Sequence, residues 1–494
     1  MLGPLQTLHI MKAVKMKKIF ASIAMGCLVG AQAQAAPIEF RYGVDVFAES
    51  QGTLDAFQSI SVLREIGPGL HFGQTLYSAA AGDAGGLFVG GFELVKRWRI
   101  GEQTELEFGG FIGGGGGAAL VSGDGLMTRA HIGLRRHLFG NFSGSFGVSY
   151  INISGSPVST PALSFGLSRD TDFAFRGGRG AGGVSSGRVV LAVKPMVKQF
   201  HTSGNLKRSG GPLGTMSLVG FEAAFAASPN ALNETFIQAT GAVAGDGEGY
   251  ADIQIGYRWK TSAHGLRAFA EVAAGFGGGG DVDTGGGLLA TVGAGVAIPL
   301  FGGFEAELGA QATTALDGDL NALSPYLRAS LKFGDHKRPY ATPRHWQLSM
   351  GASLQQPNTG FRKPGLTATA SPVLVESSVD LFLSERVYFT GNAQTVAYGD
   401  AGGYAIGLLG LGYALPLGER WTASIEGHLG AAGGGGIDTG GGLVAAGRLE
   451  LDYAINDTLA ISAGVGKMQT LRGGGGAKPV TFHLGLKTAF TTFH

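Results

Sequence analysis

The sequence predicts an all-β protein, an antiparallel transmembrane β-barrel of about 24 strands built from three internal repeats of about eight strands each. Three observations support this fold class: apolar and polar residues alternate along many segments, three stretches of the chain can be laid over one another, and short connections alternate with long ones. The composition fits the same class, because 44% of the 494 residues are apolar, 15% are charged and the formal net charge is +1.

Glycine is the anomaly of the composition. The chain contains 89 glycines, more than double the usual share of about 7%. No strict Gly-X-Y period is present, which excludes collagen, and a mean hydropathy of +0.18 is too apolar for a disordered linker. The near-zero net charge argues against a nucleic-acid partner, which normally requires a basic face.

The start of the chain predicts export. Residues 16–35 combine two lysines, a short apolar stretch and small residues that end in Ala33-Gln34-Ala35, which is the layout of a secretory signal peptide. We therefore expect residues 1–35 to be a signal peptide with an upstream extension, and the mature chain to begin at Ala36. Cys27, the only cysteine, lies in this segment, so the mature chain is expected to contain neither disulfides nor thiolate metal sites.

Three repeats of about 150 residues organise the rest of the chain, far longer than the repeats of solenoids. Their expected bounds are 36–175, 187–335 and 344–494. Each repeat carries a G-D-[AG] turn followed by a run of glycines, and these runs lie at 113–117, 277–280 and 433–436. The units therefore behave as whole barrels or as sectors of one barrel.

Within each repeat the period is two. In the last segment Phe482 and Leu484 fall on one face, whereas His483 and Lys487 fall on the other. A helix would mix these sets, but a strand keeps them apart. We expect about eight such strands per repeat, each long enough to cross a bilayer, since a tilted transmembrane strand needs about 9 to 11 residues.

Short turns on one side and long loops on the other are typical of bacterial transmembrane barrels. In this respect the chain resembles Gram-negative outer-membrane β-barrel proteins, as a class, over almost everything after the signal. The closing segment, Val480 to Phe490, is similar to the aromatic-ended terminal strand of that class, although Thr491 to His494 follow it. The resemblance implies an outer-membrane location with long loops extracellular, contact with outer-membrane lipid and lipopolysaccharide, and recognition by the barrel assembly machinery.

Two closures are compatible with this pattern. A barrel of eight strands is just wide enough for side chains to fill its interior. The predicted inner faces are rich in Gly, Ala, Ser and Thr, which would fill such a bore poorly, so the sequence favours one wide barrel. Three tandem eight-stranded barrels are the alternative, because the connections between repeats are longer than the other turns on that side.

Charged residues recur on the predicted inner face. Glu107, Glu271 and Glu426 occupy the same place in the three repeats, and around them lie Arg129, His131 and Arg448. An Arg or Lys facing lipid at the bilayer midplane costs about 2 to 4 kcal/mol, so these charges belong in the lumen. There they either set the ion preference of a channel or brace the wall by pairing, and the mixture of signs favours bracing.

Six aspartates recur in the outer loops. Three follow a glycine in a G-D-[AG] turn, and three stand between a glycine run and the next strand: Asp83, Asp246, Asp400, Asp124, Asp283 and Asp438. Their carboxylates are candidates for binding a hard cation such as Ca²⁺, which takes six to eight oxygen ligands. Two aspartates per repeat supply too few oxygens for such a site. Asp-Gly pairs commonly form tight turns, so a structural role in these turns is favoured. No metal or other cofactor is predicted.

Two functions follow. Motifs such as GxxxxGK[ST], HExxH and GxSxG are missing, so an enzyme is not expected. In the first function the protein is a passive channel, or a conduit for transport and export. An export conduit would have a periplasmic export partner. In the other it is a structural or adhesive surface protein, with Gly-rich extracellular loops and the barrel as anchor. Small inner-face residues and lumen charges favour the first, whereas the glycine runs favour the second, because glycine-only stretches can pack backbone against backbone.

Overall fold

The computed structural model of the protein contains β-strands as its only regular elements within the residues it describes. The expected signal peptide, residues 1–35, lies outside them. No helix in the described ranges is long and apolar enough to cross a membrane. The described residues are 36–51, 54–117, 125–177, 190–202, 204–226, 230–247, 249–300, 304–333, 343–367 and 370–493.

The first eight strands form barrel 1. It closes on itself because β1 pairs antiparallel with β8 as well as with β2. Its strands are β1 (Ala36–Phe47), β2 (Leu54–Gly67), β3 (Leu70–Gly82), β4 (Phe88–Arg99), β5 (Thr104–Gly116), β6 (Leu126–Phe139), β7 (Phe142–Ile153) and β8 (Ser159–Gly177).

The next eight strands form barrel 2, which closes through pairing of β9 with β16. Its strands are β9 (Val190–Phe200), β10 (Met216–Ala226), β11 (Asn233–Gly245), β12 (Ala251–Lys260), β13 (Arg267–Gly278), β14 (Leu288–Pro299), β15 (Phe304–Ala315) and β16 (Asn321–Phe333).

The last eight strands form barrel 3, which closes through pairing of β17 with β24. Barrels 1 and 3 also meet edge to edge, where β24 bonds to β8 over the pairs Phe490↔Gly177 and Thr491↔Arg176. The strands of barrel 3 are β17 (Pro343–Gln356), β18 (Val373–Phe382), β19 (Val387–Tyr398), β20 (Ala405–Pro416), β21 (Trp421–Gly433), β22 (Leu443–Ala454), β23 (Leu459–Thr470) and β24 (Val480–Phe493).

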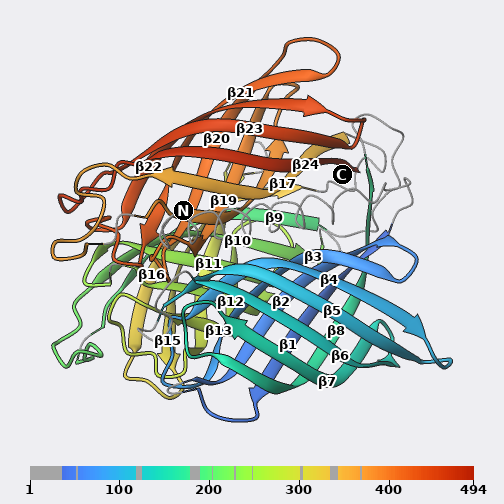
Figure 1. Ribbon diagram of the computed structural model, residues 1–494, viewed down its shortest axis with the longest axis horizontal. Coiled ribbons are helices and arrows are strands. Elements are labelled where there is room, and N and C mark those ends of the chain that lie inside the picture. The colour runs from blue at the N-terminus through green and yellow to red at the C-terminus, as the bar shows by residue number, and fades with distance from the viewer. Residues whose placement is uncertain are drawn as a thin grey trace, which may run out of the picture.

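Of the two closures that the sequence allows, the structure has the second, three eight-stranded barrels. Figure 1 shows them as separate groups of strands, blue to teal for barrel 1, green to yellow for barrel 2 and orange to red for barrel 3. The all-β class, the 24 antiparallel strands and their grouping into three eights are confirmed. The preference for one wide barrel is corrected, since each first strand pairs with the eighth strand of its own group.

The reason for this correction lies in the inner-face glycines. They do not leave the bore empty, because several of them make room for a large ring on the neighbouring strand. Phe236 lies opposite Gly256, and Tyr388 lies opposite Gly412. A Cβ on Gly256 would lie 2.2 Å from the Phe236 ring, and one on Gly412 would lie 2.1 Å from the Tyr388 ring. A narrow bore is therefore filled by alternating small and large residues.

The two faces of each strand differ as the alternation predicts. On β24, Phe482 and Leu484 are 46% and 49% exposed, whereas His483 and Lys487 are 5% and 3% exposed. Apolar side chains thus cover the outside of the barrels and charged ones fill the inside. This arrangement is the reverse of a soluble barrel and suits a surface that contacts lipid.

The two ends of the barrels are also different. We call the end with the β2–β3, β4–β5 and β6–β7 connections and their equivalents the turn end, and the opposite end, which holds the glycine runs, the loop end. Three tryptophans lie half exposed at the turn end: Trp98, Trp259 and Trp421. Such amphipathic rings are enriched where a membrane surface meets water.

An apolar cluster closes each bore at the loop end. In barrel 1, Tyr77 packs edge-on against Phe57 and Phe111, with ring centroids 6.0 Å and 4.8 Å apart. Phe200 and Tyr250 form the matching contact in barrel 2, and Phe361 and Tyr404 that in barrel 3, with centroids 5.7 Å and 6.4 Å apart. The charged side chains of each bore lie between this cluster and the turn end.

The three barrels join at the loop end with pseudo-three-fold symmetry. The third strand of each barrel packs on the fifth and sixth strands of the next: β3 on β13 and β14, β11 on β21 and β22, and β19 on β5 and β6. Among the described residues, two backbone hydrogen bonds cross these junctions, from Gly85 N to Gly285 O at 2.7 Å and from Gly403 N to Gly115 O at 3.1 Å. A single polypeptide chain therefore forms three barrels that pack around an approximate three-fold axis.

Glycine turns lie at the centre of each junction. Gly86, Gly249 and Gly403 occupy equivalent turns with φ of +90°, +87° and +89°, which side chains rarely adopt. A Cβ on these residues would lie 2.2, 3.5 and 2.9 Å from the backbone nitrogens of the next barrel's glycine run, at Gly279, Gly434 and Gly117 respectively. The G-D-[AG] turn of one barrel thus packs backbone to backbone against the glycine run of the next.

We predict that Gly86→Ala destabilises the junction by about 2 to 4 kcal/mol. Alanine is strained at the positive φ of this turn, and its Cβ would overlap the backbone of Gly279. The measurement is the denaturant midpoint of the purified protein, followed by tryptophan fluorescence. Gly427→Ala is the control, since open space surrounds Gly427, and a change within about 0.5 kcal/mol is expected there. Equal midpoints for the two variants would contradict the packing described.

Candidate functional site

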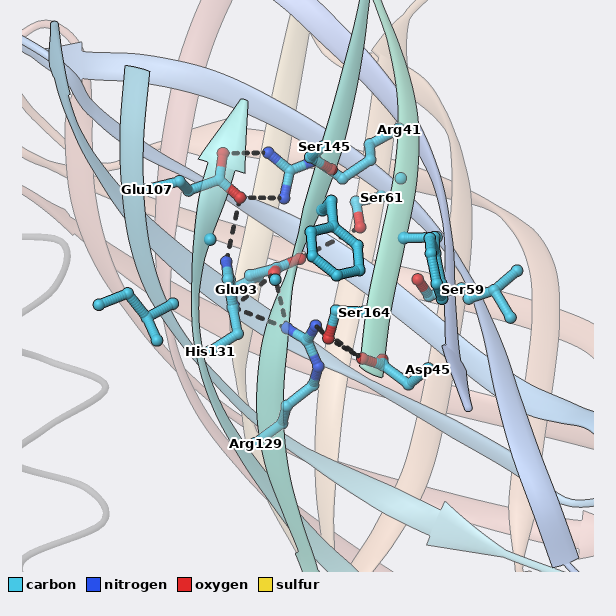
Figure 2. Close-up of a pocket in the computed structure, with 18 of the residues that line it drawn as sticks. Arg41, Asp45, Ser59, Ser61, Glu93, Glu107, Arg129, His131, Ser145 and Ser164 are labelled. Atoms are coloured by element: carbon cyan, nitrogen blue, oxygen red, sulfur yellow. Dashed lines mark hydrogen bonds and ion pairs between the residues drawn. The ribbon is translucent and has the colours of Figure 1, made fainter. Parts of the chain in front are cut away.

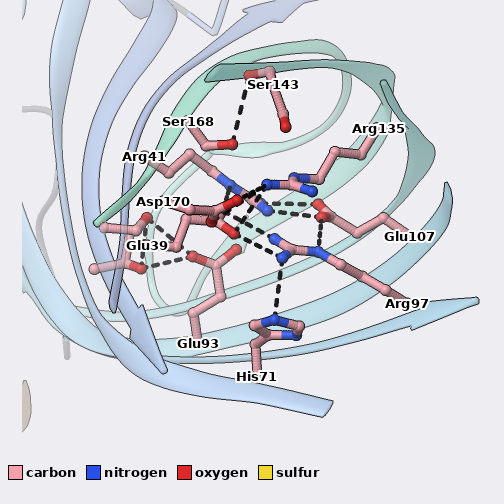
Figure 3. Close-up of polar contacts among 12 residues, drawn as sticks. Glu39, Arg41, His71, Glu93, Arg97, Glu107, Arg135, Ser143, Ser168 and Asp170 are labelled. Carbon is pink, nitrogen blue, oxygen red and sulfur yellow. Dashed lines mark hydrogen bonds and ion pairs between the residues drawn. The ribbon is translucent and has the colours of Figure 1, made fainter. Parts of the chain in front are cut away.

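The bore of barrel 1 holds a network of ion pairs centred on Glu107 of β5. Arg41 donates both terminal nitrogens to the Glu107 carboxylate at 2.8 and 2.6 Å, and the Nε of Arg97 donates to it at 2.8 Å. Arg97 also binds Glu39 through two nitrogens, at 2.6 and 2.9 Å. Figure 3 shows these side chains converging from strands on opposite walls of the barrel. The network therefore ties β1, β4 and β5 together across the bore.

A second cluster lies in the same bore, nearer the loop end. Arg129 and His131 of β6 both face inward, as the sequence predicts. Arg129 donates to Asp45 at 2.9 Å, and His131 lies 3.1 Å from Glu107. Beside them is a cavity of about 30 Å³, lined in part by serines and glycines (Figure 2). This volume has room for about two water molecules.

Barrel 2 repeats the network around Glu271 of β13. Glu271 accepts hydrogen bonds from the Nε of Arg258 at 2.7 Å and from Arg328 at 2.9 Å. Arg258 also donates two hydrogen bonds to Glu222, at 2.8 and 2.7 Å, and its guanidinium lies 4.6 Å from the Phe236 ring centroid. Both arginines are 0% exposed.

In barrel 3 the corresponding carboxylate is Glu426 of β21. It accepts hydrogen bonds from the Nε of Arg448 at 2.8 Å and from the Tyr388 hydroxyl at 2.7 Å. Arg448 also binds Glu376, which lies 3.0 Å from His483. Each of the three recurrent glutamates is thus paired with arginine inside its own barrel.

The position of the arginine is exchanged in barrel 3. In barrels 1 and 2 the glutamate lies opposite an arginine on the fourth strand and a glycine on the sixth: Arg97 and Gly133 flank Glu107, and Arg258 and Gly293 flank Glu271. In barrel 3 the order is reversed, with Gly412 on the fourth strand and Arg448 on the sixth. The ion pair is retained although its two residues come from a different pair of strands.

The burial of these charges determines what the bores can do. A water-filled lumen leaves the charges that line it accessible to solvent, as in wide porin-type barrels. Here Glu107, Glu271 and Glu426 are 3%, 2% and 3% exposed. At the level of these residues the bores are therefore packed rather than open to water.

The loop aspartates do not converge on one point. Asp83 lies 3.6 Å from Arg208 of barrel 2, Asp283 accepts the Gly285 N–H at 3.1 Å, and Asp438 accepts the Gly476 N–H at 2.8 Å. Asp400 has a left-handed φ of +51° in its turn. Asp124 lies outside the described residues.

Asp246 has the best-defined surroundings of these aspartates. Its carboxylate accepts the Gly214 N–H at 2.9 Å and lies 3.3 Å from the Lys207 ammonium. The hydrogen bond from Gly214, followed by Lys207, lowers the pKa of Asp246 below its usual value. Within the described part of the chain no group of three or more His, Cys, Asp or Glu residues is arranged to hold a metal ion.

Several members of the networks were not identified from the sequence. Arg41, Lys194, Glu222 and Glu376 lie on the first two strands of their barrels, which precede the segments that align among the repeats. Lys194, for example, lies 3.1 Å from Glu222 and 2.9 Å from Glu307. Their signal was the same alternation, since Arg41, Lys194 and Glu222 are each flanked by apolar neighbours that face outward.

Comparisons with known proteins give no family. No protein-family model matches the chain, and no curated protein matches it. Among solved structures, the siderophore receptor PirA from Pseudomonas aeruginosa is 10% identical, with 93% of this chain and 81% of that chain covered and a TM-score of 0.29. OpdQ from Pseudomonas aeruginosa is 11% identical, with 92% and 98% covered and a TM-score of 0.22. TM-scores this low carry no inference about the function of this chain.

We predict that Glu271→Gln destabilises the protein by about 3 to 5 kcal/mol, because it leaves Arg258 and Arg328 buried with one carboxylate fewer. The control is Glu102→Gln, since Glu102 is exposed in the β4–β5 turn and its loss is expected to change stability by less than about 0.5 kcal/mol. Denaturant midpoints in detergent micelles measure both variants. A Glu271 variant as stable as the control would show that the buried pairs do not brace the bore.

Proposed function

We propose that this protein is an integral outer-membrane protein in which three sealed barrels anchor a rigid, Gly-rich surface outside the cell. The observation that carries the proposal is the closure of each bore, by an apolar cluster at the loop end and by buried ion pairs beneath it. A conduit needs a continuous aqueous path, whereas an anchor needs only an apolar outside and a stable inside.

The outside of the barrels supports membrane insertion. Leucine, valine, isoleucine and phenylalanine dominate the exposed strand positions, and exposed tryptophans lie at the turn end. The expected signal peptide and the resemblance to outer-membrane β-barrel proteins agree with this location. Lipid and lipopolysaccharide are then the surroundings of the barrels, and the barrel assembly machinery is the partner expected during insertion.

The joined loop end supports a structural or adhesive role. Backbone-to-backbone glycine contacts hold the three barrels in one fixed arrangement. Arg362 strengthens the surface of barrel 3, because its guanidinium donates to the backbone oxygens of Gly399, Asp400 and Gly435 at 2.6, 2.8 and 3.1 Å. A surface with this many backbone contacts is suited to present a constant shape to an external partner.

A transport conduit is the second candidate. The cavity beside Arg129 and His131 favours it, because one wall of that cavity is lined by small residues such as Gly43, Ser59 and Ser145. Rearrangement of the adjacent ion pairs would be needed to extend this space through the bore. A periplasmic partner that drives such a rearrangement belongs to this second candidate.

Planar-bilayer recording separates the two candidates. With sealed barrels we expect no current above leak from protein whose β-sheet circular dichroism and protease resistance show that it is folded. Discrete current steps would contradict the anchor proposal. In that event, replacing Glu107, Glu271 and Glu426 by lysine tests the conduit, because lumen charges set the cation-to-anion permeability ratio. An unchanged permeability ratio would mean that the three glutamates only brace the barrel wall.

Cysteine labelling tests the orientation. Cys27 is the only cysteine and lies in the expected signal peptide, so single cysteines can be introduced without a background signal. We expect Lys363→Cys, at an exposed loop-end position, to react with a membrane-impermeant maleimide on intact cells. Glu102→Cys, at an exposed turn-end position, is expected to react only after lysis. The opposite pattern would place the loop end in the periplasm.

A further inference from the structure

The bore of barrel 3 differs from the other two in its balance of charge. In barrel 1, four buried carboxylates face four buried arginines: Glu39, Asp45, Glu93 and Glu107 with Arg41, Arg97, Arg129 and Arg135. Barrel 2 is also balanced, because five buried cations and Lys260, which lies 3.1 Å from Glu234, face six buried carboxylates.

In barrel 3 the acids are in excess. Among the described side chains, five buried carboxylates share two cations, Lys487 and Arg448; these acids are Glu376, Asp380, Glu426, Glu450 and Asp452. Two buried histidines, His428 and His483, lie in the same bore. Even if both histidines were charged, one carboxylate would have no cation to balance it.

Asp380 is the carboxylate left over. It lies on β18, two residues from the turn-end limit of the strand, and its side chain is 1% exposed. Neither of its oxygens accepts a hydrogen bond from any described residue. The other four carboxylates of this bore each bind one of its two cations. Asp380 is therefore a buried acid without a partner of its own.

Two polar but uncharged side chains lie directly opposite Asp380 on the adjacent strands. Gln347 of β17 and Thr390 of β19 pair with it in register, and both are buried. The next inward residues toward the turn end are His345, which is partly exposed at the mouth, and Tyr388, whose hydroxyl already donates to another carboxylate at 2.7 Å. A hydroxyl or an amide can donate a hydrogen bond, but it does not neutralise a buried charge.

The charges that act on Asp380 come from across the bore. They are the ammonium of Lys487 on β24 and the carboxylates of Glu426 on β21 and Glu450 on β22. Lys487 is already shared, because its Nζ binds Glu450 and lies 3.0 Å from Asp452. One ammonium among three carboxylates leaves the third uncompensated, and an ionised carboxylate in that position is strongly destabilising.

We propose that Asp380 is a proton-binding site, and that its carboxyl group carries a proton in folded barrel 3 at neutral pH. A proton fits better than a metal ion, because no three or more His, Cys, Asp or Glu residues in the described ranges are arranged to hold one. The cavity of about 30 Å³ in this bore lies beside His428 and Arg448, and Asp380 does not line it. A proton needs no such space.

This proton makes the stability of barrel 3 depend on pH. The unfolded chain releases it above about pH 4, the ordinary ionisation range of aspartate, whereas the folded bore retains it. The stabilisation is therefore fully present below that range and declines as the pH rises, until the folded carboxyl group also ionises. One retained proton raises the unfolding equilibrium constant by up to about tenfold for each pH unit.

Asp380→Asn tests the proposal, because asparagine has the shape of a protonated aspartate and holds no titratable proton. Unfolding of barrel 3 in detergent micelles is followed by the fluorescence of Trp421, in a protein whose other three tryptophans are replaced by phenylalanine. From about pH 5 to about pH 7 we expect the unfolding constant to rise at least about tenfold more with Asp380 than with the asparagine variant. At neutral pH the variant is expected to be at least as stable.

Glu376→Gln is the matched control. Glu376 is a buried carboxylate on the same strand, but it binds Arg448 and lies 3.0 Å from His483. Its replacement is expected to lower the denaturant midpoint at both pH values, because Arg448 loses a buried partner.

Infrared spectroscopy observes the proton directly in the folded protein. At neutral pH we expect the carbonyl band of a protonated carboxylic acid, which disappears as the pH is raised and is missing from Asp380→Asn. If that variant does not fold, Asp380→Glu keeps the carboxyl group and is expected to shift the frequency of the same band.

Three results would overturn the proposal. The first is absence of the carboxylic acid band from the folded protein at neutral pH. The second is a loss of stability in Asp380→Asn equal to that in Glu376→Gln, which would mean that Asp380 is ionised and paired. The third is a midpoint that rises when sodium or magnesium replaces choline, in the unmodified protein but not in Asp380→Asn, which would assign the site to a metal ion. None of these results bears on whether the bores conduct, which planar-bilayer recording decides.

Discussion

Paired charge inside a narrow barrel is the constraint on which the rest of this structure depends. An eight-stranded barrel with an apolar outside must fill its bore with what the inward strand positions supply, and here those positions supply carboxylates and guanidinium groups. A buried charge without a partner is strongly destabilising. Each bore meets this requirement with a glutamate on its fifth strand that binds arginine: Glu107, Glu271 and Glu426. The exchange of arginine and glycine between the fourth and sixth strands of barrel 3 shows that the pairing, rather than the position of the arginine, is what all three barrels share.

The glycines serve two different kinds of packing. On the inner faces some of them lie opposite large rings, as Gly256 does opposite Phe236, and so allow a narrow bore to be filled. At the loop end they let the backbone of one barrel approach that of the next, as at Gly86 and Gly279. The second use joins three barrels that close independently into one body, and it explains why the glycine motifs recur at equivalent points of the three repeats.

Much of this fold could be predicted from the sequence, because alternation of period two separates an apolar outer face from a charged inner one. The same alternation identified Glu107, Arg129 and Arg448 as bore-facing. It could not decide the closure, since the strand pattern is the same for one ring of 24 strands and for three rings of eight. The number of small inner-face residues favoured one wide barrel, which was wrong. A glycine such as Gly412 leaves room for Tyr388 only because the two residues lie opposite each other, and the sequence of one strand does not show which residue of the next strand it faces. Arg41 and Glu222 were missed because they lie on strands that do not align among the repeats.

Three separately closed and filled barrels are the central claim, and a density map of the protein in nanodiscs, viewed along the membrane normal, tests it most directly. The account predicts three small rings of density related by an approximate three-fold axis, each with density across its centre at the level of the ion pairs. A single wide ring would contradict the closure, and three rings with empty centres would contradict the packing of charge on which the proposed anchor function rests.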